Sequence, residues 1–297
     1  MAWQSLVIEV PGAVAECLSD ALLEAGALSA SVEDANIGTA AEEPRYAEPT
    51  FDQRADPWPH SRISAMFEMG VDVKRALAQA TDACMLSTLV NARIEILDDK
   101  DWVRHTQSQF EPIQITKRIW IVPSWHANPD PTAINIVLDP GLAFGSGSHP
   151  TTQLCAAWLE QRMTPGASLI DYGCGSGILA IIASRLGAGH LCGVDIDPVA
   201  VTTAQENAQA NGVTGLFIDG TTRIDHQADL VVANILANPL KILAPVLAQL
   251  TRSGGQLVLA GLLVEQIQSV SACYAPYFQM STFDTQGDWA ALEGVRR

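Results

Sequence analysis

The chain has 297 residues, 48% of them hydrophobic, which allows two domains that each bury a core. No signal sequence is recognisable and no apolar run reaches the roughly 18 residues of a membrane-spanning helix, so we expect a cytoplasmic protein. The net charge of −16 is concentrated in residues 1–100, which hold 17 acidic and 7 basic side chains. This charge disfavours binding to bare nucleic acid and favours a basic protein partner. A role in solubility alone explains the charge equally well.

The six cysteines occur at positions 17, 84, 155, 174, 192 and 273. They form no Cys-x-x-Cys pair, and none has a histidine at the short spacing typical of zinc ligands. We therefore expect no metal site. Free thiols, as found in a reducing compartment, are the expected state of the cysteines.

Residues 1–98 predict a small ferredoxin-like α+β domain. Hydrophobic periodicity predicts six elements in the order βαββαβ, with strands at 3–10, 27–34, 62–69 and 92–97 and helices at 13–26 and 71–81. An acidic, proline-containing loop at about 37–61 interrupts the pattern, and a loop of that length is often functional.

Residues 99–139 predict a structured connector. They contain Trp102, Trp120 and Trp125 and two short alternating strands, at 113–116 and 119–123. A flexible linker would carry fewer large aromatic side chains.

From residue 140 to residue 297, strands and helices alternate. The expected strands are 168–170, 191–194, 216–219, 230–233 and 256–260, and the expected helices begin near 150, 178, 198, 239 and 264. Segments 278–283 and 289–294 could close the sheet as an antiparallel pair. This order predicts an α/β fold with a mainly parallel, Rossmann-like, seven-stranded sheet.

A glycine-rich loop follows the first of these strands and carries the strongest functional signal. Asp171 is followed by glycines at 173, 175 and 177, and the next strand ends on Asp195. Asp195 is placed to accept hydrogen bonds from ribose hydroxyls. The spacing Asp-x-Gly-x-Gly-x-Gly differs from the Gly-x-Gly-x-x-Gly of NAD-binding proteins. It resembles motif I of class I S-adenosylmethionine-dependent methyltransferases, which implies that the glycines lie under the methionine part of the cofactor and Asp171 near its amino group. A dinucleotide site or a loop without a ligand is the alternative.

Residues 139–152 are dense in glycine and hydroxyl side chains and lead into a helix. We interpret them as a cradle for the cofactor, with Phe144 and the Thr152 hydroxyl as contacts; a plain helix-capping turn is the alternative. His149 is a candidate for a catalytic base. A histidine before a proline at a helix start is at least as often a capping or packing residue.

Asn234 ends the strand predicted at 230–233, at the edge of the sheet where open α/β folds hold their ligands. Its side-chain carbonyl can accept hydrogen bonds from an amine and direct the amine lone pair to a methyl group, so we assign it as the catalytic residue. In methyltransferases that act on adenine N6 or on glutamine, the related motif continues after the asparagine with Pro-Pro and an aromatic residue. This chain has Ile235-Leu236-Ala237 there, which disfavours stacking on a flat base and recognition of an amide. An asparagine that only makes a turn is the alternative.

Together these segments resemble the bacterial ribosomal protein L11 methyltransferases. The resemblance includes the connector, where Asp101-Trp102 and the segment 120–125 match, and an acidic front domain that captures the substrate in that family. It implies that Thr152, Gly173, Asp195 and Asn234 contact S-adenosylmethionine. It also implies trimethylation of lysine side chains and of the N-terminal α-amine of protein L11.

Other functions remain open from the sequence alone. They are a methyltransferase acting on another protein, a small-molecule amine or a nucleic acid, an NAD-dependent dehydrogenase, and a sensor that binds S-adenosylmethionine without turnover. Nothing in the sequence demands more than a monomer, and we expect no direct membrane contact.

Overall fold

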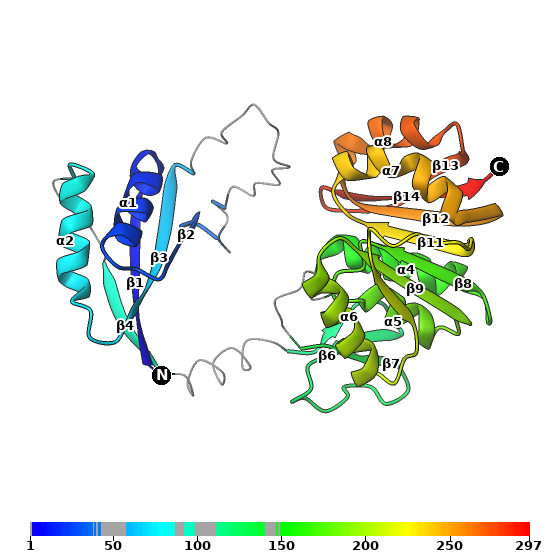
Figure 1. Cartoon of the computed structure of the whole chain (residues 1–297), viewed down its shortest axis with the longest axis horizontal. Coiled ribbons are helices and arrows are strands. Elements are labelled where there is room, and N and C mark those ends of the chain that lie inside the picture. The colour runs from blue at the N-terminus through cyan, green and yellow to red at the C-terminus, as the bar shows by residue number, and fades with distance from the viewer. Residues whose placement is uncertain are drawn as a thin grey trace. The chain divides into compact units, whose positions relative to one another are not determined.

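A computed structural model of the chain describes residues 2–37, 39, 41–42, 58–86, 92–98, 111–139, 147 and 149–297. The chain divides into two compact units, residues 1–109 and 110–297 (Figure 1). Among the helices in these described ranges, none is long and apolar enough to cross a membrane.

The first unit is a four-stranded antiparallel sheet with two helices. Its elements are β1 (Ala2–Pro11), α1 (Gly12–Glu24), β2 (Ser29–Asp34), β3 (His60–Glu68), α2 (Val73–Ala83) and β4 (Arg93–Asp98). The strand order is β2-β3-β1-β4, and every neighbouring pair is antiparallel. The ferredoxin-like fold predicted from the βαββαβ order is confirmed.

The two faces of this sheet differ. Alternate residues of β1 and β3, such as Leu6, Ile8 and Phe67, are fully buried in one core with apolar residues of α1 and α2. The residues between them lie on the opposite face, which we call the open sheet face and define by Trp3, Ser5, Val7, Ser64 and Met66. All five are partly exposed. No described helix packs on that face.

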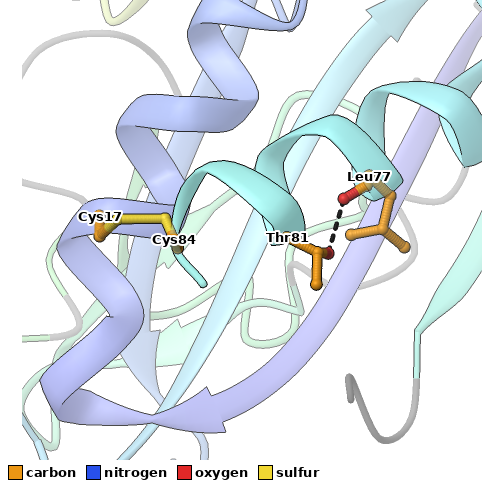
Figure 2. The surroundings of a disulfide bond; sticks show 4 residues. All are labelled: Cys17, Leu77, Thr81 and Cys84. Carbon is orange, nitrogen blue, oxygen red and sulfur yellow. Dashed lines mark hydrogen bonds between the residues drawn. A yellow bond between two sulfur atoms is a disulfide. The ribbon is translucent and has the colours of Figure 1, made fainter. Parts of the chain in front are cut away.

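A disulfide joins the two helices of this unit. Cys17 in α1 bonds to Cys84, the residue after α2, with the Cα atoms 6.1 Å apart (Figure 2). The expectation that the cysteines are free thiols is therefore wrong for this pair and correct for the other four. Spacing rules detect cysteines that are close along the chain, whereas these are separated by 67 residues and meet because the topology places α1 beside α2.

We expect Cys17→Ser to destabilise the first unit by about 2–4 kcal/mol, because the cross-link restricts a long segment of the unfolded chain. Calorimetric unfolding of the full chain without reductant should show the loss as a lower transition temperature. Cys273→Ser, which removes a partly exposed free thiol, is the matched control. Reductant should lower the transition of the wild-type protein and leave that of Cys17→Ser unchanged. Equal transitions for wild type and Cys17→Ser without reductant would contradict the disulfide.

The second unit begins with a small sheet made of β5 (Ile113–Gln114), β6 (Ile119–Val122) and β7 (Ile134–Val137). The first two strands were predicted, and β5 is shorter than expected. β7 was not predicted; it pairs in parallel with β6. The described part of the predicted connector therefore lies in the second unit.

The large sheet of the second unit has the strand order β10-β9-β8-β11-β12-β14-β13. Its strands are β8 (Ser168–Tyr172), β9 (His190–Asp195), β10 (Leu216–Asp219), β11 (Ala228–Asn234), β12 (Thr251–Leu263), β13 (Phe278–Gln286) and β14 (Trp289–Arg296). β14 runs in the direction opposite to the other six strands of this sheet, so the predicted mainly parallel sheet with a closing hairpin is confirmed. β12 is longer than predicted.

Helices cover both faces of this sheet (Figure 1). The helices are α4 (Pro150–Arg162), α5 (Ile178–Arg185), α6 (Pro198–Ala210), α7 (Ala237–Leu250) and α8 (Ile267–Tyr274), with a 3-10 turn, η1 (Val264–Gln266), before α8. One core contains residues of α4, α5 and α6, and the other contains residues of α7 and α8. The predicted start of α6 is confirmed: Asp197 accepts a hydrogen bond from the Val199 N–H, and Pro198 is the first helical residue.

Candidate active site

The predicted site residues that the structure describes gather at the carboxyl edge of the large sheet. β8 and β11 are neighbours at the centre of the sheet. β9, which follows β8 in the chain, lies on one side of β8, and β11 lies on the other side. Such a point, where the strand order reverses, is where open α/β sheets hold their ligands. The glycine loop follows β8, and Asn234 ends β11.

The glycine loop turns sharply between β8 and α5. Gly173, Gly175 and Gly177 all have positive φ, at 78°, 51° and 76°. The Gly173 N–H donates to the Val194 carbonyl at 2.7 Å, which holds the loop against β9. A Cβ on Gly177 would lie 3.0 Å from that of Ala204 in α6, so this glycine also serves helix packing.

Asp195 is joined to the glycine loop. One carboxylate oxygen accepts a hydrogen bond from the Gly175 N–H at 2.8 Å, and the other accepts one from the Asp197 N–H at 3.0 Å. The side chain is partly exposed. A carboxylate oxygen can accept more than one hydrogen bond, so Asp195 retains capacity for hydroxyl groups of a ligand.

Asp171 is buried, with 1% of its surface exposed. Its Oδ2 accepts a hydrogen bond from the Ala180 N–H at 3.1 Å, in the first turn of α5, whereas its Oδ1 has no partner among the described residues. Burial raises the pKa of this carboxyl to about 7, and the nearby Asp195 charge adds to the increase. A buried acceptor without a partner fits a cofactor that carries a cationic amino group nearby, as S-adenosylmethionine does.

This raised pKa predicts how cofactor affinity depends on pH. A bound cation favours the carboxylate form of Asp171, lowers its pKa and thus releases a proton. We therefore expect the affinity for S-adenosylmethionine to increase from about pH 5.5 to pH 7.5 and then to level off. Calorimetric titrations in buffers of different ionisation enthalpy would count the released proton. Asp171→Asn should abolish both the proton release and the slope; the same slope in this variant would exclude Asp171 as its cause.

Asn234 and Thr152 meet although they lie far apart along the chain. The Asn234 side-chain amide donates to the Thr152 hydroxyl at 3.4 Å, a long hydrogen bond. Thr152 is buried in the first turn of α4, and Asn234 is partly exposed. This contact leaves the side-chain carbonyl of Asn234 as an acceptor for a substrate amine.

His149 caps and packs, as the sequence alternative proposed. Its Nδ1 accepts the Thr151 N–H at 3.4 Å and lies 2.7 Å from the Thr151 hydroxyl, at the start of α4. Its ring meets that of Trp289 edge to face, with centroids 4.6 Å apart, and burial lowers its pKa. Trp289 was predicted only as a strand residue; no local motif marks it. Phe144, a predicted cofactor contact, lies outside the described residues.

Comparison with known proteins decides the family. Residues 2–297 match the family model described as ribosomal protein L11 methyltransferase (PrmA). The chain belongs to this family. The L11 methyltransferases of Dechloromonas aromatica and Thiobacillus denitrificans are each 50% identical to it, over 296 and 297 residues, with 100% of both chains covered. A solved L11 methylase structure from Lactobacillus delbrueckii subsp. bulgaricus aligns with a TM-score of 0.59 and 34% identity, covering 63% of this chain and 100% of that one.

Membership in the L11 methyltransferase family agrees with the resemblance that the motifs carried. The match to the family model includes the first unit. There the sequence resembled the family in the order of its strands and helices more than in its motifs. A dehydrogenase is therefore excluded as the family of this chain.

Proposed function

We propose that this protein transfers methyl groups from S-adenosylmethionine to amines of ribosomal protein L11. One observation carries the proposal: in a member of the L11 methyltransferase family, the glycine loop, Asp195 and Asn234 lie at one edge of the sheet. This arrangement provides a place for a nucleoside cofactor beside an acceptor group for an amine. A protein that modifies a ribosomal component would act in the cytoplasm.

The residues that would hold S-adenosylmethionine are Gly173, Gly175, Asp171, Asp195 and Thr152. The positive φ of these glycines turns the loop sharply beside the site. Asp195 accepts hydrogen bonds from hydroxyls, and the Asp171 oxygen that has no partner among the described residues supplies negative charge. When bound, the cofactor supplies an electrophilic methyl group on its sulfonium. The protein therefore needs to align an amine and needs no covalent nucleophile.

Alignment of the amine is assigned to Asn234. Its carbonyl oxygen accepts a hydrogen bond from an N–H of the amine, which orients the nitrogen lone pair. The amine must be neutral to react. At pH 7 this costs roughly 4–5 kcal/mol for a lysine side chain of pKa about 10.4, and about 1–1.5 kcal/mol for an α-amine of pKa about 8. Apolar neighbours such as Leu236 disfavour the ammonium form and reduce that cost.

Successive methylations require that the amine rotate and lose a proton between transfers. We infer that lysine side chains and the N-terminal α-amine of L11 are both acceptors and reach the trimethyl state. No side chain of this site is assigned as a dedicated base; water can remove the proton between turnovers.

We assign substrate recognition to the first unit, through the open sheet face. The front of the chain is acidic, with 17 acidic and 7 basic side chains in residues 1–100, and this suits a basic ribosomal protein. We expect Trp3→Ala combined with Met66→Ala to raise the KM for L11 about tenfold while the Kd for S-adenosylmethionine stays unchanged. Leu23→Ala, at an exposed residue of α1 away from this face, is the control. An unchanged KM for L11 would remove the assignment.

The test of the function is intact-protein mass spectrometry. Ribosomal proteins from cells that lack this enzyme are incubated with the protein and S-adenosylmethionine. Mass steps of one methylene confined to L11 would establish the reaction and its substrate. Steps on another protein would redirect the assignment to a different amine. Cofactor binding without any mass step would favour the sensor function.

A further inference from the structure

Ile235, the residue after Asn234, is enclosed by two glycines. A Cβ on Gly173, in the glycine loop, would overlap the Ile235 Cγ2 atom. A Cβ on Gly261, in β12, would overlap the Ile235 carbonyl oxygen and lie 2.7 Å from its carbonyl carbon and 3.0 Å from its nitrogen. Real Cβ atoms do not approach other atoms this closely, so any larger residue at either glycine would displace Ile235.

The two glycines belong to segments on opposite sides of β11. Gly173 follows β8, and Gly261 lies in β12, and both strands pair with β11. Gly261 has a positive φ of 83°. It lies where the pairing of β12 with β14 shifts register between Leu259 and Leu262. This local irregularity brings the backbone of β12 against the backbone of Ile235, which a regular strand with a side chain at that position would prevent.

Ile235 has no polar group in its side chain and does not react. It is the residue next to Asn234, whose side-chain amide donates to the Thr152 hydroxyl. The Gly173 contact links the same residue to the loop proposed to lie under the cofactor. Ile235 is therefore in contact with the glycine loop and is covalently joined to the residue on the acceptor side of the site.

We propose that Ile235, held between Gly173 and Gly261, is a positioning residue that aligns Asn234 with the glycine loop and so couples cofactor binding to alignment of the amine. This inference rests on the proposed methyl transfer. Gly261 belongs to no motif used to assign the site, and Ile235 entered the sequence analysis only as the residue that follows Asn234. Neither is offered as a contact of cofactor or substrate.

The test compares two glycines of the same strand, β12. Gly261→Ala and Gly254→Ala both place a Cβ on a residue with positive φ, at 83° and 71°. The nearest atom to a Cβ on Gly254 is a guanidinium nitrogen of Arg252 at 3.8 Å, so only Gly261→Ala disturbs Ile235. We expect Gly261→Ala to lower kcat on the order of 10²-fold relative to Gly254→Ala, with the Kd for S-adenosylmethionine within about threefold. Equal kcat values for the two variants would overturn the proposal.

Ile235→Ala provides a second variant in case Gly261→Ala does not fold. It removes the Cγ2 atom that faces Gly173 and retains the backbone. We expect a kcat about tenfold below that of wild type with little change in cofactor affinity. The double variant Gly173→Ala/Ile235→Ala should bind the cofactor more tightly than Gly173→Ala alone, because the overlap is relieved. Strictly additive losses in this pair would refute the contact.

A readout independent of turnover separates this proposal from the proposed function. The side-chain amide signal of Asn234 can be followed by nuclear magnetic resonance with isotope-labelled asparagine and assigned with Asn234→Asp. S-adenosylmethionine should shift this signal equally in wild type and Gly254→Ala and differently in Gly261→Ala. If wild type fails to methylate L11 yet these shifts differ as expected, only the function is wrong. If the shifts are alike in all three proteins, the positioning role is wrong.

Discussion

Asn234→Ala is expected to reduce methyl transfer to L11 by roughly two to three orders of magnitude at saturating S-adenosylmethionine, with the protein still folded. The substitution removes the carbonyl that is proposed to orient the amine. Misalignment of reacting groups by about an ångström costs a factor of this size. It also removes the amide that donates to Thr152, a weak contact at 3.4 Å whose loss costs little stability.

Single-turnover kinetics with saturating cofactor would measure the effect on the transfer step itself. Asn234→Asp is the matched comparison, because it keeps an acceptor oxygen and adds a negative charge. That charge stabilises an ammonium, so we expect partial activity that increases with pH as the amine is deprotonated. Transfer by Asn234→Ala at the wild-type rate would show that Asn234 only makes a turn at the end of β11.

Asp195→Ala is expected to weaken binding of S-adenosylmethionine on the order of 10²-fold or more, while kcat at saturating cofactor falls much less. The variant loses the carboxylate proposed to bind ribose hydroxyls, and hydrogen bonds to a charged group contribute about 1.5–3 kcal/mol each. It also leaves the Gly175 N–H without the acceptor that holds it at 2.8 Å. Both effects act on the cofactor side of the site.

Calorimetric titration of S-adenosylmethionine into each variant would measure this loss. Asp225→Ala, which removes an exposed carboxylate paired with Arg223, controls for the change in net charge. Asp195→Asn keeps a neutral hydrogen-bond acceptor, so its affinity for S-adenosylmethionine should lie between those of the wild type and Asp195→Ala. A cofactor Kd unchanged in Asp195→Ala would withdraw Asp195 from the binding site.

Most of the fold was predictable from the sequence because local signals define its elements. The Asp197 cap, Pro198 at the first helical position and the glycines after Asp171 all act within a few residues. Periodicity then indicated which faces are buried, and the order of strands and helices restricted the topology. The boundaries were less accurate. β7 was missed although its sequence, Ile-Asn-Ile-Val, has the β-branched residues typical of a strand.

The site was predictable only as a set of parts. Loop spacing singled out Asp171 and Asp195, and the end of a predicted strand singled out Asn234, since each of these signals is local. That the Asn234 amide meets Thr152, and that Asp171 has an oxygen without a partner among the described residues, depends on packing between distant segments.

By itself, then, the sequence determined the two folds, the cofactor loop and the family resemblance, because these depend on residue spacing and on hydrophobic periodicity. Only the tertiary structure decided that Cys17 bonds to Cys84 and that Ile235 lies between Gly173 and Gly261. Such contacts join residues that are far apart in the chain, and they form only when the sheets and helices bring those residues together. No local pattern encodes them.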